Sequence, residues 1–197
     1  MKRVVLFAAV VLSVFISCRK QEVPPGTVTP GHPQMRITNL GDSVVTFGKG
    51  ASFNLDGLDG KDVYFGTMLV GDAVYQQDKY LWLVSTSFYA SLPVNEHESI
   101  PVMQYNDSIR TADFNGYNWY NASTIVLAQK VIGTTQPPFW AGDWKEASHR
   151  YIPVQLIRPD GFYNGWVEVS FSIQQERLVL HRAAVCRVPS TTIAAGN

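Results

Sequence analysis

Cysteine is almost absent from this chain of 197 residues, which contains only Cys18 and Cys186. Charged residues are also few, at 16% of the chain, with 16 basic and 16 acidic side chains. At most one disulfide can form, so stability must come mainly from a buried core, and Cys186 is expected inside it as a small apolar residue. Because no excess of basic residues is available to neutralise phosphates, we expect no nucleic-acid partner.

Long apolar runs are missing too, since no segment reaches the about 20 apolar residues of a membrane-spanning helix. The longest run, residues 4–16, follows the basic pair Lys2 and Arg3 and has the length of a signal-peptide core. The segment from Phe15 to Cys18 resembles a lipobox, with small Ser17 before the cysteine. We therefore predict a lipoprotein signal peptide over residues 1–17 and acylation of Cys18. The alternative is an ordinary secretory signal followed by an incidental cysteine.

Residues 18–34 are predicted to form a tether between the lipid and a single domain at residues 35–197. Four prolines and two glycines in this stretch leave no periodic apolar face. A proline-rich chain rises by about 3.1 Å per residue, so the tether would span roughly 50 Å at most. The lipid makes the membrane the expected partner. The expected location is the cell envelope at the outer membrane, with the periplasmic and surface faces both left open.

Sustained helical periodicity is also missing, while aromatic residues make up 12% of the chain and turn residues punctuate short apolar runs. This pattern predicts an all-β fold, a single antiparallel β-sandwich of jelly-roll or immunoglobulin-like kind, with a barrel as the alternative. Gly48-Lys49-Gly50 is expected to close a hairpin, and Pro159-Asp160-Gly161 to close a turn in a C-terminal three-stranded meander. Trp166 is expected to anchor the sandwich core at the start of a strand. The predicted strands are residues 43–47, 51–55, 62–70, 79–86, 123–130, 150–158, 163–173 and 177–188.

Two stretches carry a resemblance to a known group of proteins. The first contains Leu55-Asp56-Gly57-Leu58-Asp59-Gly60, and the second contains Tyr163-Asn164-Gly165-Trp166 followed by the ending Ile193-Ala194-Ala195-Gly196. Together they resemble secreted or lipid-anchored proteins of Bacteroidota, which carry an Asp-rich loop early and a Tyr-Gly-Trp strand late. Asn164 stands where that group has an aromatic residue. The resemblance implies a β-sandwich outside the cytoplasm and no particular biochemical activity.

The Asp-rich loop is a candidate calcium site. It offers four oxygen-bearing side chains within nine residues, on a segment that glycines can bend: Asn54, Asp56, Asp59 and Asp62. Calcium binds six to eight oxygens of this kind. The alternative is a plain connection between strands, in which Asp and Gly are the expected turn formers. Calcium is the only cofactor that the sequence suggests.

Two aromatic-rich loops, residues 114–121 and 138–144, are a second candidate site. Aromatic faces can stack on sugar rings, and the neighbouring Asn and Asp side chains can bond hydroxyl groups. The predicted ligand-binding residues are Trp119, Tyr120, Trp140 and Trp144. The alternative is that these rings pack into the core or cap its ends, because aromatic side chains bury large apolar areas.

Catalytic motifs are missing from the chain. It has neither a Gly-x-Ser-x-Gly elbow nor a His-Glu-x-x-His metal motif, and the segment Asn95-Glu96-His97-Glu98 has no second histidine at ligand spacing. The sequence therefore favours a non-catalytic envelope lipoprotein that binds or scaffolds a glycan or an envelope protein. The alternative is a small extracytoplasmic hydrolase that acts on polysaccharide or peptidoglycan through paired carboxylates.

Overall fold

The computed structural model describes residues 33–58 and 60–197, and these residues form strands and no helix. The predicted signal peptide, Cys18, most of the tether and Asp59 lie outside the described residues. Within residues 33–58 and 60–197 no helix is long and apolar enough to cross a membrane. The strands are β1 (Met35–Val45), β2 (Ala51–Phe53), β3 (Val63–Asp72), β4 (Gln77–Thr86), β5 (Ala90–Val94), β6 (Ser108–Ile109), β7 (Asn118–Asn121), β8 (Thr124–Gly133), β9 (Phe139–Ala141), β10 (Arg150–Arg158), β11 (Gly161–Ser172), β12 (Arg177–Cys186) and β13 (Ile193–Ala194).

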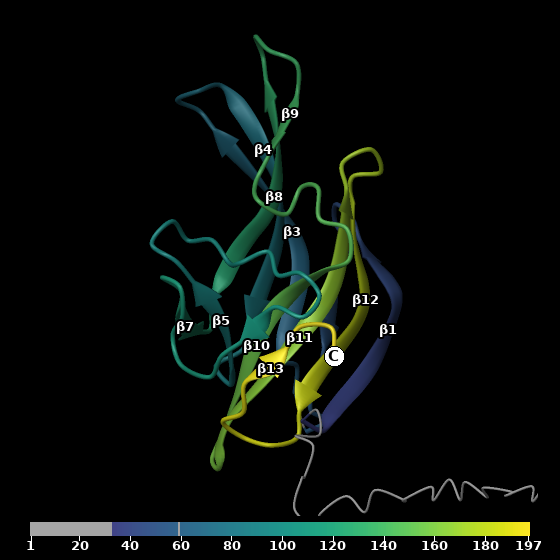
Figure 1. Cartoon of the computed structure of the whole chain (residues 1–197). Helices are drawn as coiled ribbons and strands as arrows, with labels where there is room; N and C mark the ends of the chain where they lie inside the picture. Colours follow the sequence, from purple (N-terminus) through teal and green to yellow (C-terminus); the bar gives the residue numbers. More distant parts are fainter. Residues whose placement is uncertain (1–32, 59) are drawn as a thin grey trace, which may run out of the picture. The chain divides into compact units, whose positions relative to one another are not determined.

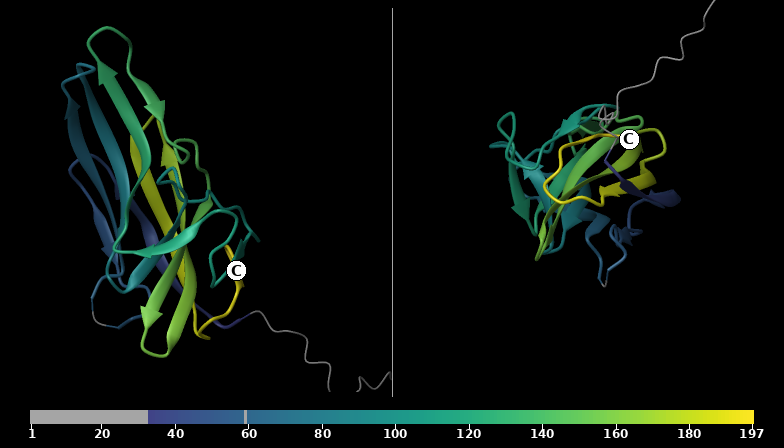
Figure 2. Two further views of the ribbon diagram at one scale, coloured as in Figure 1. Left: turned by 90° about the vertical axis from the view of Figure 1, so that its left-hand side faces the viewer. Right: turned by 60° about the horizontal axis from the view of Figure 1, so that its bottom comes forward.

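Two antiparallel sheets face each other, which confirms the predicted all-β sandwich (Figures 1 and 2). The larger sheet has the order β1-β12-β11-β10-β5-β7, and the smaller has the order β2-β3-β4-β8-β9. Neither sheet closes into a barrel. A third pairing, β13 with β6, lies outside both sheets. The C-terminal meander is also confirmed, because β10, β11 and β12 are successive neighbours and Gly161 has a φ of 144° after the Pro159-Asp160 turn.

The main core lies between the two sheets. Ile152, Val167 and Ala183 stand side by side across β10, β11 and β12 and are at most 1% exposed. Trp82 of β4 packs from the smaller sheet with its ring edge-on to Phe171 of β11, at a centroid distance of 5.4 Å. Burial of each large apolar side chain contributes about 1.5–3 kcal/mol to the free energy of folding. This core sets the positions of the strands that carry the surface sites.

The larger sheet is covered on its outer face as well, by residues of the 103–117 segment and by the 193–197 segment. This second core contains Met103, Ile109, Phe114, Tyr151, Trp166, Ala184, Cys186, Ile193 and Ala195. Trp166 therefore lies in the middle of β11 and in this second core, rather than at a strand start in the main core as expected. Its Nε1 donates a hydrogen bond to the carbonyl oxygen of Asn197 at 3.2 Å. Cys186, 1% exposed, is the buried apolar residue that the sequence predicts.

Asn164 belongs to a buried hydrogen-bond network beside the second core. Its Nδ2 donates to the carbonyl oxygen of Thr191 at 2.8 Å and to Oγ1 of Thr111 at 3.2 Å. Its Oδ1 accepts a hydrogen bond from Nε2 of Gln155 at 2.9 Å. A buried amide must find such partners, since an unsatisfied polar group costs about 1–3 kcal/mol. This network explains a polar residue at a position where the resembling group has an aromatic one, because it joins β11 to Thr111 of one covering segment and to Thr191 just before the other.

The turn after β1 differs from the prediction. Thr46 and Lys49 bond to each other in both directions, so the tight turn is centred on Phe47 and Gly48, and Gly48 has a φ of 76°. The two flanking strands do not pair as a hairpin, because β1 joins the larger sheet and β2 joins the smaller one. The turn therefore carries the chain from one layer to the other.

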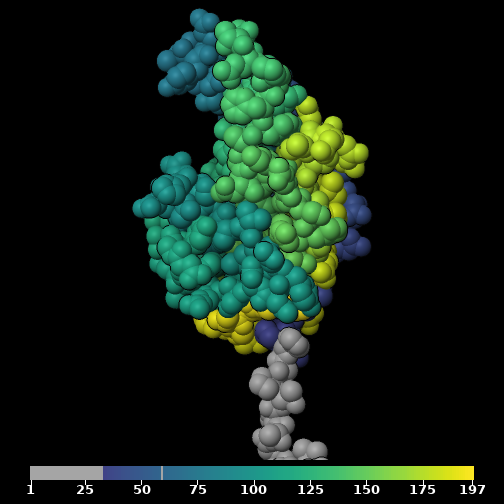
Figure 3. Space-filling view, turned by 45° about the horizontal axis from the view of Figure 1, so that its top comes forward, coloured from purple at the N-terminus to yellow at the C-terminus, as the bar shows by residue number. Residues whose placement is uncertain are grey.

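Two long hairpins project beyond the sandwich, as the space-filling view shows (Figure 3). They are formed by the ends of β3 and β4 and by the ends of β8 and β9. Tyr75, at the tip of the first hairpin, is 75% exposed. The segment from β5 to β7 gathers at a different place, along the side of the molecule, and it contains the candidate site described next.

Candidate ligand-binding site

A pocket of about 590 Å³ opens beside the edge strand β7. We call it the side pocket. Its walls come from the end of β5 and the turn after it, from the hairpin at residues 114–117, and from β7. The lining residues are Val94, Asn95, Glu96, His97, Asn115, Gly116, Tyr117, Asn118 and Tyr120. Ligand pockets of small molecules occupy about 300–1,000 Å³, so the volume suits one to a few sugar units.

Two tight turns shape the side pocket. Asn115 and Gly116 have φ values of 50° and 81°, the left-handed conformations that an Asn-Gly hairpin turn requires. The turn is closed by hydrogen bonds between Phe114 and Tyr117 in both directions, at 3.0 and 2.8 Å. On the other wall, Oδ1 of Asn95 accepts the backbone N–H groups of His97 and Ser99 at 3.0 and 2.9 Å. Both walls are therefore held by local bonds that do not need a ligand.

Strand alternation decides which aromatic residues of β7 face the pocket. Successive side chains of a strand point to opposite faces, so Asn118 and Tyr120 lie on one face and Trp119 on the other. Tyr120 is 54% exposed and lines the side pocket, whereas Trp119 packs against the second core near Phe114. The Tyr120 ring and the Asn118 amide therefore both face the side pocket.

The other predicted aromatic residues do not join Tyr120 in one surface. Trp144 is 1% exposed in the main core, and Trp140 is partly buried against the same core, 5.2 Å from the Trp82 ring. With Trp119 at the second core, the structure places three of the four predicted ligand-binding rings in packing positions. Burying a large apolar ring stabilises the fold more than leaving it exposed. The three rings therefore follow the alternative that the sequence left open, which is packing into the core.

Residues that the sequence analysis did not assign to a glycan site complete the side pocket. Glu96 and His97 are 86% and 78% exposed at the side chain, and His97 Nε2 lies 3.5 Å from Glu96 Oε1. Within residues 33–58 and 60–197 no group of three or more metal-ligating side chains occurs, here or elsewhere. The pocket therefore offers hydrogen-bond donors and acceptors together with aromatic surface. In the sequence, the Asn115-Gly116 pair and the turn-forming Asn95 were the features that could have indicated this pocket.

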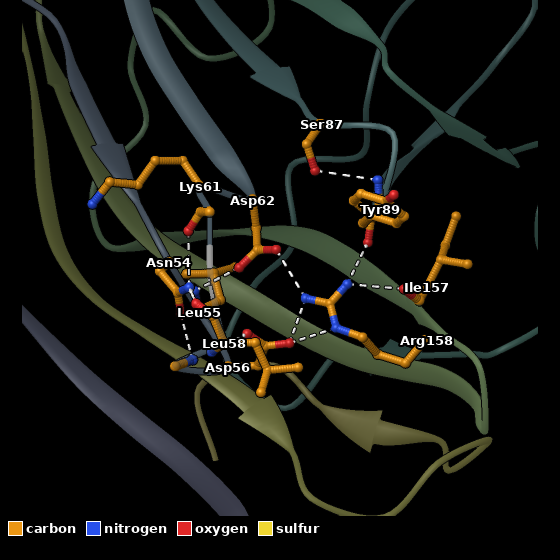
Figure 4. Close-up of polar contacts among 12 residues, drawn as sticks. Asn54, Leu55, Asp56, Leu58, Lys61, Asp62, Ser87, Tyr89, Ile157 and Arg158 are labelled. Carbon is orange, nitrogen blue, oxygen red and sulfur yellow. Dashed lines mark hydrogen bonds and ion pairs between the residues drawn. The ribbon is translucent and has the colours of Figure 1, made fainter.

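The Asp-rich loop binds an arginine of its own chain (Figure 4). Asp56 Oδ2 accepts a hydrogen bond from Arg158 Nε at 2.6 Å, and Asp62 Oδ1 lies 3.0 Å from Arg158 Nη2. All three side chains are at most 16% exposed. Burial acts to lower the pKa of the Arg158 guanidinium, but the hydrogen bonds that Arg158 donates to Asp62 and Asp56 outweigh it and raise that pKa. The guanidinium thus supplies the positive charge between two carboxylates that were expected to bind calcium.

The remaining oxygens of the loop also have partners within the chain. Asp62 Oδ2 accepts the backbone N–H of Leu55 at 2.7 Å, and Asn54 Oδ1 accepts the backbone N–H of Gly57. Asp59, the fourth predicted ligand, lies outside the described residues. These bonds support the alternative that the sequence left open, a connection built from turn-forming Asp and Gly residues. The arginine comes from β10, about 100 positions away in the chain.

The chain matches no family model, no curated protein and no solved structure. The geometry of its sites is therefore what supports a function.

Proposed function

We propose that this chain is a lipid-anchored protein of the bacterial cell envelope whose β-sandwich binds a glycan in the side pocket. The observation that carries the proposal is the lining of that pocket, where Tyr117 and Tyr120 stand among the amides of Asn115 and Asn118. A sugar presents C–H faces that aromatic rings cover and hydroxyl groups that amides and carboxylates bind. The lipobox-like segment ending at Cys18 supports the location, since two or more acyl chains give stable anchoring.

The size of the pocket favours a glycan over the other ligand expected from the sequence, an envelope protein. A stable protein interface buries about 800 Å² on each partner, and its central contacts are well packed and dry. The side pocket is a local hollow lined by polar and aromatic side chains, and Glu96 and His97 in its lining are largely exposed. A small hydroxyl-rich ligand fits this chemistry better.

Hydrolysis of polysaccharide by paired carboxylates finds less support. A glycosidase needs two facing carboxyl groups, one of which stays protonated to act as an acid. The two carboxylates that the Asp-rich loop brings together, Asp56 and Asp62, both pair with Arg158 and are at most 16% exposed, so their oxygens contact the protein rather than a substrate. We therefore propose binding as the role of the side pocket.

The lipid anchor predicts how the protein partitions. Cys18→Ala should remove the acylation site, so the chain should leave the membrane fraction and appear in the soluble envelope fraction. Membrane fractionation and the intact mass of the purified protein measure this change. Cys186→Ala is the matched control, because Cys186 is buried in the second core and should not affect partitioning. The anchor is refuted if the Cys18→Ala protein stays with the membrane or if the native mass lacks acyl chains.

The side pocket predicts measurable glycan binding by the acylated protein in a detergent that carries no sugar. Probes are β-1,4-glucan and α-mannan oligosaccharides and the disaccharide of peptidoglycan, titrated by calorimetry. At least one should bind, and Tyr120→Ala should weaken that binding about tenfold, which corresponds to about 1.4 kcal/mol. Tyr89→Ala is the matched control, since Tyr89 is 67% exposed and lies outside the pocket. If no probe binds, or if Tyr120→Ala binds as tightly as the parent, the proposal fails.

A further inference from the structure

A row of polar side chains lies on the outer face of the larger sheet, on or next to neighbouring strands. We call it the polar cluster. It comprises Asp42 of β1, His149 just before β10, Glu168 and Ser170 of β11, and His181 and Arg182 of β12. It is separate from the side pocket, which is formed around β5 and β7.

Three members of the polar cluster form a continuous chain of hydrogen bonds. His181 Nε2 lies 2.8 Å from Ser170 Oγ, and His181 Nδ1 lies 2.6 Å from Asp42 Oδ1. A carboxylate accepts hydrogen bonds, so in the neutral imidazole Nδ1–H donates to Asp42 and Nε2 accepts the proton of the Ser170 hydroxyl. A nucleophile within hydrogen-bond distance of a base, with that base oriented by a third group, is the arrangement that activates serine in acyl transfer.

Two adjacent β-bulges create this arrangement. On the β11 side the pairing passes from Glu168–Arg182 to Val169–Leu180, and on the β1 side it passes from Asn39–Arg182 to Ser43–Leu180. His181 is therefore left without a ladder partner on either neighbour. Bulges redirect side chains and are frequent next to active sites. In a regular ladder His181 would have a directly opposed residue on each neighbouring strand, instead of reaching toward Asp42 on one side and Ser170 on the other.

Backbone conformations in the polar cluster also depart from the ordinary. Asp42 has a φ of 51° and His149 a φ of 48°, which are left-handed values that non-glycine residues rarely adopt. The conformation of His149 directs its backbone N–H to Ser170 Oγ at 2.9 Å. Strain of this kind persists where the surrounding structure imposes it, and it gathers at functional sites. Ser170 is thus held by a backbone donor as well as by the imidazole.

A second set of contacts holds the His181 ring in place through the neighbouring His149 ring. The rings of His149 and His181 stack with centroids 4.5 Å apart and an interplanar angle of 18°. Glu168 accepts hydrogen bonds from His149 Nδ1 at 2.8 Å and from Arg182 Nε at 2.5 Å. Burial acts to raise the pKa of Glu168, but the bonds from Arg182 and His149 outweigh it, so the pKa is lowered and Glu168 stays ionised. The ionised carboxylate keeps the covering imidazole in place.

We propose that Ser170 is an activated nucleophile that cleaves accessible carboxylic esters, with His181 as general base and Asp42 as the residue that positions it. Ser170 Oγ attacks the ester carbonyl carbon while its proton passes to His181 Nε2. The C–O bond of the ester then breaks, the alcohol leaves with that proton, and an acyl group remains on Ser170. Water then attacks the acyl carbon while its proton passes to His181 Nε2. The bond between the acyl carbon and Ser170 Oγ breaks, His181 returns the proton to Oγ, and the acid is released. This activity is additional to the binding proposed for the side pocket.

Covalent labelling tests the proposal directly. The acylated full-length protein is treated with a fluorophosphonate, which reacts with activated serines, and the labelled peptide is identified by mass spectrometry. We expect the label on Ser170, and we expect Ser170→Ala to lose labelling and about 100-fold of p-nitrophenyl acetate cleavage. Exposed imidazoles cleave that ester slowly without any serine, so the position of the label is the deciding result. The proposal is overturned if Ser170 is not labelled.

Ser172 provides a matched control on the same strand and the same face. Its Oγ contacts Gln174 and Gln175 and has no histidine partner among residues 33–58 and 60–197, so Ser172→Ala should label at the parent rate. Equal labelling of Ser170 and Ser172 would contradict activation by His181. This comparison also separates a reactive site from general surface reactivity.

Asp42→Asn tests the positioning role without disturbing the fold. Asp42 is 74% exposed at the side chain, and asparagine tolerates a positive φ, so the melting temperature should be unchanged. The limiting rate of labelling at saturating probe should fall about tenfold or more, while the half-saturating concentration should not change. If the variant labels as fast as the parent, Asp42 has no part in the reaction and the proposed triad is refuted.

Discussion

Arg158→Met should lower the free energy of unfolding by about 3 kcal/mol at neutral pH. The methionine keeps most of the apolar stem but removes the guanidinium that lies between Asp56 and Asp62, whose side chains are 16% and 7% exposed. Two largely buried carboxylates then lack their cation, and the backbone carbonyls of Tyr89 and Ile157 lose a donor. Because Asp56 keeps some access to water, the loss should lie at the low end of the range for a broken buried ion pair. Urea unfolding of parent and variant measures it.

Arg187→Met is the matched control for Arg158. Arg187 is exposed and, like Arg158, lines a pocket of about 460 Å³ beside the Asp-rich loop. Its replacement should change stability by less than about 0.5 kcal/mol. A similar loss in both variants would mean that general positive charge, rather than the pairing with Asp56 and Asp62, stabilises the region. An Arg158→Met protein as stable as the parent would show that the loop does not depend on its arginine.

Trp166→Ala should be the most damaging single substitution in the second core, with a loss of about 4 kcal/mol. The indole is completely buried, packs edge-on to Tyr151 at a centroid distance of 5.3 Å, and lies 5.1 Å from the Arg182 guanidinium carbon. Its removal also takes away the donor to Asn197. Amide hydrogen exchange should therefore quicken at residues 193–197 more than in β4 of the main core, because only the covering segment loses its support.

Tyr75→Ala is the control for the loss of an aromatic ring as such. Tyr75 is 75% exposed at a hairpin tip, and its replacement should leave stability within about 0.5 kcal/mol of the parent. If Trp166→Ala unfolded the two cores together, with uniform exchange across all strands, the second core would not be a separate layer but part of one cooperative unit.

The sequence predicted those features of the fold that depend on residues close together along the chain. The Pro159-Asp160-Gly161 turn and the strands of the meander follow from local conformational preference and apolar pattern, and both are present. The first strand was predicted at residue 43, but it begins at Met35, because the Gly41-Asp42 bulge hides its alternation. Strand β5 was not predicted, since Ser91 and Pro93 interrupt its apolar run even though all five of its residues are buried.

The sites depend on residues that are distant in the sequence, which local patterns do not reveal. The loop 54–62 has the oxygens of a cation site, yet the cation that it binds is Arg158, which lies on β10. Tyr120 was predicted as a ligand-binding residue and lines a pocket, but its partners Asn95 and His97 come from a turn that was weighed only for metal binding. Ser170 and His181 meet because of a bulge, and bulges leave no reliable trace in an apolar pattern.

The place of β1 in the larger sheet has a consequence for synthesis. Within that sheet β1 pairs only with β12, whose first residue follows the start of β1 by about 140 positions. At roughly 5–20 residues per second, the ribosome needs about 7–28 seconds to make the missing partner. Throughout that interval the oldest strand of the nascent domain has an open edge on the side where β12 belongs. A holding chaperone that recognises extended apolar chain is therefore expected to act on this polypeptide until its final strands arrive.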